Sequence, residues 1–102
     1  MPSAIWVPKA EQDLEEILFY IRVTTEQPLT AQRIGQEIAT EAARLVELPD
    51  TGARHPAGPA NWRYSRHKRW LIFYQTHPQG IEVMRVIDAA RDLPRVLADP
   101  AE

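Results

Sequence analysis

The side chains best suited to recognition or catalysis are cationic, and most of them lie close together in the second half of the chain. Basic and aromatic residues alternate between positions 63 and 70, and two arginines follow: Arg63, Arg66, Lys68, Arg69, Trp70, Arg85 and Arg91. The guanidinium group is a planar fork that binds phosphates, carboxylates and aromatic faces. Such a set fits contact with nucleic acid or a nucleic-acid enzyme, docking of an acidic protein segment, or simple solvation of an exposed hairpin.

Residues for covalent, metal or cofactor chemistry do not form recognisable sets. The chain has no cysteine and four scattered glycines, so neither a thiolate metal site nor a phosphate-binding glycine loop is predicted. His55, His67 and His77 lack the i, i+4 spacing of helical metal ligands, and no glycines flank Ser65 as they would a nucleophile. We therefore expect no catalytic residues, metal, cofactor or small-molecule ligand, which favours a binding protein over an enzyme.

Charge is divided unevenly along the chain. Residues 1–50 carry four basic and nine acidic side chains, a net charge of −5, whereas residues 51–102 carry eight and five, a net charge of +3. A basic working surface is therefore expected from the second half. The longest apolar run, residues 70–74, is too short to span a bilayer, and no signal peptide is visible. We expect a soluble cytoplasmic protein without membrane contact.

The first half predicts a short strand followed by two helices. Residues 4–7 are apolar and end at a proline, as in a strand stopped by that residue. Helices are expected from Lys9 to about Thr25 and from near Pro28 to about Leu48. Each carries one apolar stripe of helical period: Leu14, Ile17, Leu18 and Ile21, then Ile34, Ile38, Ala42 and Leu45. A short connection makes the pair an antiparallel hairpin.

The second half is typical of strands. After a loop over residues 53–61, β-forming residues extend from 62 to 87, with a turn expected at 77–80. Residues 70–74 are apolar on both alternating faces, which predicts a central strand covered twice. A short last helix is expected over 91–97.

These elements predict an α+β fold in a single domain, residues 1–102. An N-terminal strand and an antiparallel helical hairpin, packed on a small, mostly antiparallel sheet, precede the short C-terminal helix. The hairpin can cover only one face of the sheet, which leaves an apolar face for a partner.

Four fragments, taken in order and spacing, resemble the ParE branch of the RelE/ParE toxin superfamily. They are Trp6-x-Pro8-x-Ala10-x-x-Asp13-Leu14-x-x-Ile17-x-x-Tyr20-Ile21, Ala31-x-Arg33-Ile34 leading to Leu48-Pro49-x-x-Gly52, Arg63 followed by Ile72-Phe73-Tyr74, and Val83-Met84-Arg85-Val86-Ile87 followed by Ala90-Arg91-Asp92. The resemblance implies a toxin that forms a hetero-oligomer with its cognate antitoxin. Tyr20, the basic hairpin and the chain after Asp88 are the expected walls of the antitoxin groove, and the seven basic and aromatic residues named first are expected to contact target or antitoxin.

The superfamily offers two mechanisms. RelE-like toxins cut messenger RNA on the ribosome and commonly have an arginine three residues before a strand tyrosine, where this chain has Leu71 before Tyr74. They also often place a tyrosine or histidine near the C-terminus, and residues 95–102 contain neither. ParE-like toxins poison DNA gyrase by binding and need no catalytic set. The resemblance therefore favours a gyrase inhibitor.

Two alternatives stay open at this point. One is a ribosome-dependent endoribonuclease that uses Arg66, His67, Lys68 or Arg85 in an unfamiliar arrangement. The other is a degenerate toxin that only binds its antitoxin. Family members often have His-Gly between the last strand and the Ala-Arg-Asp segment, where this chain has Asp88-Ala89.

Overall fold

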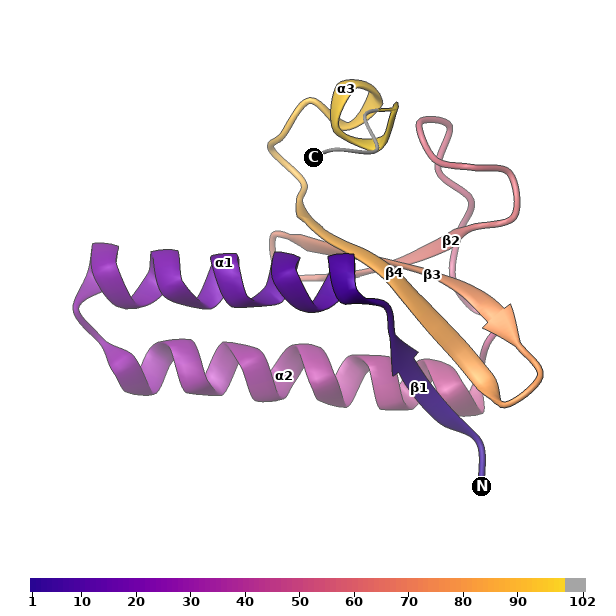
Figure 1. The fold of residues 1–102 in the computed structure, drawn as a ribbon, viewed down its shortest axis with the longest axis horizontal. Coiled ribbons are helices and arrows are strands. Elements are labelled where there is room, and N and C mark those ends of the chain that lie inside the picture. The colour runs from indigo at the N-terminus through magenta and orange to yellow at the C-terminus, as the bar shows by residue number, and fades with distance from the viewer. Residues whose placement is uncertain (99–102) are drawn as a thin grey trace.

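The computed structural model describes residues 1–98 and has the expected α+β architecture (Figure 1). Its elements are β1 (Ser3–Trp6), α1 (Pro8–Thr25), α2 (Pro28–Glu47), β2 (Arg63–His67), β3 (Trp70–His77), β4 (Gly80–Asp88) and α3 (Leu93–Ala98). The predicted order of elements is confirmed, and most boundaries fall within one or two residues of expectation. Within the described residues, no helix combines the length and apolar character needed to cross a membrane.

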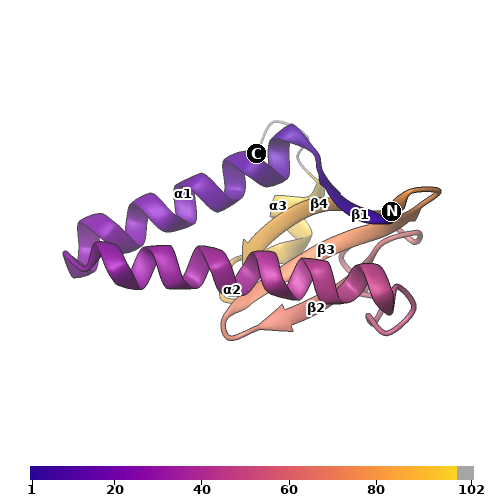
Figure 2. The same cartoon turned by 90° about the horizontal axis from the view of Figure 1, so that it is seen from below.

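The helices α1 and α2 form an antiparallel hairpin whose distal end projects beyond the sheet in both views (Figures 1 and 2). Each helix begins at a proline, whose fixed φ suits the first helical turn. Glu26, the residue after α1, caps the helix in the left-handed conformation with φ 55°. Gly35 allows the two helices to approach closely, since a Cβ there would lie 3.1 Å from Leu18 Cδ1.

The sheet has the strand order β1-β4-β3-β2, in which only the β1–β4 pair is parallel. The first strand therefore pairs with the last, from Ser3 opposite Gly80 to Trp6 opposite Val83. Gly80 has φ 132°, and a Cβ there would collide with the Ser3 carbonyl oxygen, so this close pairing needs glycine. The internal position of β3 confirms the prediction of a central strand.

The hairpin covers one face of the sheet and buries a hydrophobic cluster there. The predicted stripe of α2 is buried, and that of α1 packs partly buried against it. The strands contribute the opposing side chains: Trp70, Ile72, Tyr74, Ile81, Val83 and Val86.

The other face of the sheet is covered from within the chain. Leu71, Phe73 and Ile87 project into a second cluster, which α3 closes with Leu93 and Val96. Residues of the loop before β2, including Ala57 and Trp62, also pack there. The expectation that this face stays open for a partner is therefore corrected, because a short helix and an irregular loop hold enough apolar side chains to close it.

Truncation of the first cluster should destabilise the fold strongly. Ile38 has no exposed surface, so Ile38→Ala is expected to lower the free energy of unfolding by about 2–5 kcal/mol through lost burial and a residual cavity. Urea denaturation measures this change. Thr40→Ala, at an exposed position of the same helix, should change it by less than about 0.5 kcal/mol. An equally small effect at Ile38 would contradict the packing.

Candidate functional site

A cleft of about 630 Å³ opens between α1, the start of α2 and the end of the sheet where β3 begins and β4 ends. Its middle is apolar and includes Ile21 and Trp70. Its rim is polar and includes Tyr20, Arg69 and Arg91. An apolar centre within a polar rim is the arrangement by which proteins bind one another. The cleft is therefore the candidate docking site for a protein segment.

The sheet side of the rim is held by Asp88. Its Oδ2 lies 2.5 Å from Arg69 Nη2, and its Oδ1 accepts a hydrogen bond of 2.9 Å from the Ala90 N–H. The Ala89 N–H donates to the Arg69 carbonyl at 2.7 Å. Asp88, the departure from the family's His-Gly, thus orients the Arg69 guanidinium at the cleft while offsetting part of its charge.

The α1 side of the cleft is fixed by a buried ion pair between Asp13 and Arg85. Arg85 Nε donates to Asp13 Oδ2 at 2.7 Å and Nη2 donates to Oδ1 at 3.1 Å, and both side chains are 8% exposed. Asp13 Oδ2 also accepts from the Val86 N–H at 3.0 Å. Beyond Val83, β4 has no pairing with β1, so this carboxylate takes the place of the missing strand.

A second set of polar contacts ties the β2–β3 hairpin to α2. His67 Nε2 and Lys68 Nζ lie 2.7 and 3.0 Å from Glu37 Oε1, and the hydrogen bonds from His67 and then Lys68 lower the pKa of that carboxyl. Ser65 donates to Glu41, whose pKa is lowered chiefly by its hydrogen bonds from Arg44. His67 and Lys68 therefore hold the hairpin on the helix.

Arg63 holds the turn that follows α2. Its Nη1 donates to the Gly52 carbonyl at 2.9 Å, and its Nη2 lies 3.8 Å from Asp50 Oδ1. Nearby, the Tyr74 hydroxyl donates to the Pro49 carbonyl at 2.8 Å and accepts from the Gly52 N–H. Burial of this phenol raises its pKa.

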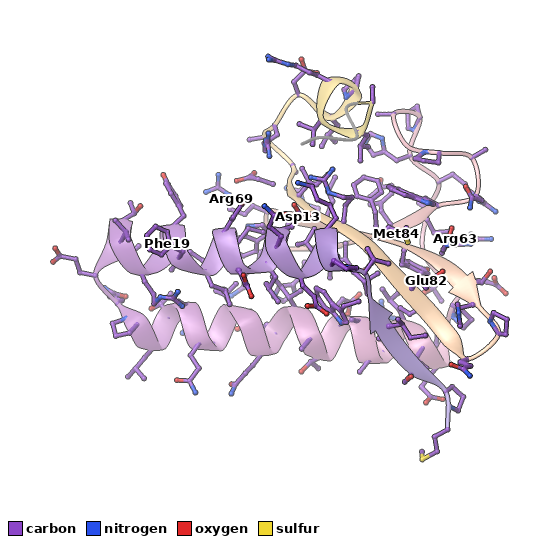
Figure 3. All side chains as sticks on the ribbon, viewed as in Figure 1. Asp13, Phe19, Arg63, Arg69, Glu82 and Met84 are labelled. Carbon is purple, nitrogen blue, oxygen red and sulfur yellow. The ribbon has the colours of Figure 1, made fainter. Side chains whose placement is uncertain are left out.

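The cleft brings together only part of the predicted binding set. Arg69, Trp70 and Arg91 line it, although Trp70 is largely buried. Arg63 lies at the opposite end of the sheet (Figure 3).

The rest of the predicted set lies elsewhere. Arg66 is exposed and donates to the Lys68 carbonyl at 2.7 Å, Lys68 faces α2, and Arg85 is inside the protein.

Sequence reasoning missed the roles of Asp13, Glu37 and Glu41. Asp13 lies four residues before Ile17, on the helix face that carries the buried apolar stripe of α1. An acidic residue on that face was the sequence signal for a buried partner. The sequence positions of Glu37 and Glu41 give no indication that these side chains contact the β2–β3 hairpin. Within residues 1–98, no group of three or more His, Cys, Asp or Glu side chains is placed to hold a metal ion.

Arg85→Ala is expected to lower the free energy of unfolding, because Arg85 is a structural residue inside the protein. The truncation leaves the Asp13 carboxylate buried without its cation, which costs about 3–5 kcal/mol. Arg66→Ala removes a solvent-exposed arginine and should change the free energy of unfolding by less than about 0.5 kcal/mol. Urea denaturation of both variants makes the comparison, and equal stabilities would contradict the structural role of the pair.

Comparison with known proteins agrees with this geometry. A solved structure described as "Chromosomal ParDE TA system from P. aeruginosa" has the same fold, with TM-score 0.73 and 22% sequence identity over 86% of this chain and 96% of that chain. No curated protein matches. A family model described as "ParE toxin of type II toxin-antitoxin system, parDE" matches residues 4–93. Because that match extends over most of the chain, this protein belongs to the ParE toxin family.

Proposed function

We propose that this protein is the toxin of a type II toxin–antitoxin pair, that it inhibits DNA gyrase in the cytoplasm by binding, and that a cognate antitoxin neutralises it. Family membership supports the toxin assignment. The observation that carries the binding mechanism is the Asp13–Arg85 pair. It keeps buried an arginine that the ribonuclease alternative counts among its candidate cations.

Three of the four side chains that the ribonuclease alternative could use form structural contacts, and the fourth, Arg66, is exposed. Cleavage of a phosphodiester needs a general base, a general acid and free cations at the phosphate. His67 and Lys68 both contact Glu37, and Arg85 contacts Asp13. Leu71, at the position where RelE-like toxins commonly have arginine, lies in the second hydrophobic cluster. Inhibition by surface complementarity requires none of these groups.

Gyrase inhibition should weaken when the arginine side chain that Asp88 orients at the cleft is removed. Arg69→Ala is expected to raise the toxin concentration that half-inhibits supercoiling. The rise should correspond to a loss of about 2 kcal/mol in binding free energy, as for a binding hot spot. Arg33→Ala, an exposed arginine on α2 outside the cleft, is the matched control and should leave the value unchanged. The measurement is supercoiling by purified gyrase with added toxin.

The same proposal predicts that transcripts stay intact. Mapping of transcript ends after induction in cells should show no codon-positioned cuts. Such cuts together with unaffected supercoiling would replace the proposal by the ribonuclease alternative. Neither effect, in a protein that still binds its antitoxin, would indicate a degenerate toxin.

We also propose that the cleft receives the antitoxin, as an acidic segment that folds when it docks. Trp70 and Ile21 provide an apolar centre, Tyr20 is 66% exposed at the rim, and the Arg69 guanidinium offers a cation. The ordering cost of such a segment is offset by burial of its apolar side.

Tyr20→Ala should therefore weaken antitoxin binding by about tenfold or more, which corresponds to about 1.4 kcal/mol. Leu48→Ala, which truncates an exposed apolar residue outside the cleft, should have no effect. Isothermal titration with the product of the neighbouring reading frame measures both. Affinity should also fall with added salt, because an Arg69 contact is screened. Equal affinities of both variants would exclude the cleft as the docking site.

A further inference from the structure

A third face of α1 belongs neither to the core nor to the cleft. Phe19 and Val23 are 61% and 60% exposed on this face, one helical turn apart. Both belong to the second half of α1, which projects beyond the sheet (Figure 1), and Phe19 is labelled there in Figure 3. Neighbouring large apolar side chains on a projecting helix indicate an interaction surface.

This face has the shape that receives a side chain of another helix. Glu15, Phe19 and Arg22 of this face line a hollow of about 560 Å³ together with Leu18, at the border with the core stripe, and Glu16, at the border with the cleft. Glu15, Leu18, Phe19 and Arg22 stand at positions i, i+3, i+4 and i+7. Four residues at these spacings form the hole into which a knob inserts when two helices pack. The hole is open, because the same helix buries its opposite side on α2 and the sheet.

The charges at the two ends of the hole are opposite and unpaired within the described residues. Glu15 lies four residues before Phe19 and Arg22 lies three residues after it, and neither forms an ion pair there. At about 100° per residue, both lie on the same side of Phe19, about 40° and 60° from it. A two-fold axis passing beside Phe19 would therefore place the Glu15 of one helix opposite the Arg22 of another.

We propose that a second copy of this chain docks on this face, with the two α1 helices antiparallel about a two-fold axis near Phe19. Each Phe19 ring enters the hole of the other copy, and Glu15 and Arg22 form two symmetric ion pairs. A two-fold interface requires such self-complementarity, and the face provides it in both shape and charge. The contact is independent of gyrase inhibition. It leaves Tyr20 and the cleft, on the other flank of α1, accessible to the antitoxin.

This arrangement is tested by reversing the charge of Glu15 or of Arg22, and then by reversing both charges in the same chain. The full chain is expected to self-associate reversibly in sedimentation equilibrium between micromolar and millimolar concentrations. Glu15→Lys or Arg22→Glu should each weaken the association by about tenfold, because two exposed ion pairs become two like-charge contacts. The double variant E15K/R22E should restore it. Glu47→Lys, the same charge change at an exposed position at the end of α2, is the matched control and should have no effect.

The outcomes distinguish a second copy of this chain from the antitoxin as the molecule that binds this face. A chain that stays monomeric throughout overturns the proposal, and so does a double variant that associates no better than the singles. A monomeric chain whose antitoxin binding is weakened by Glu15→Lys would assign the face to the antitoxin instead. Circular dichroism of all the variants checks that their helices are intact.

Discussion

One carboxylate, that of Asp13, fixes where α1 lies. The strand β1 ends at Trp6, so the outer edge of β4 beyond Val83 faces a helix instead of a strand. Asp13 satisfies that edge by accepting from the Val86 N–H and from two nitrogens of Arg85. Beyond this contact, α1 continues past the end of the sheet (Figure 1). The cleft opens in the angle between them, and the outward face of α1 is left clear of the sheet.

Features of this fold that arise from residues near one another in the sequence could be predicted, whereas contacts between distant residues could not. The two apolar stripes repeat every three or four residues, and residues 70–74 are apolar throughout, so both the hairpin and the central β3 follow from local pattern. The closure of the second face does not, because it depends on where Leu93 and Val96 fall once the chain turns back. The role of Arg85 was hidden for the same reason, since its partner lies 72 residues away.

The basic cluster shows how strand geometry can disperse residues that are close in sequence. Arg63 and Arg69 lie at opposite ends of a strand pair, because β2 extends about 3.3 Å per residue before the chain reverses. Lys68 turns toward α2, and Arg66 turns toward solvent. Of the predicted set, only Arg69, which Asp88 orients, and Arg91 bring a cation to the cleft. The fold and the family follow from the sequence more readily than the working surface does.

The pairing of β1 with β4 has a consequence for biosynthesis. A ribosome makes Ser3–Trp6 long before the strand that pairs with them, Gly80–Asp88, because both helices and two strands lie between. The Asp13–Arg85 pair spans almost the same interval. Contacts between such distant segments form only after a long loop has closed. The nascent chain can build its helical hairpin early, but the four-stranded sheet and the cleft can form only after β4 has emerged.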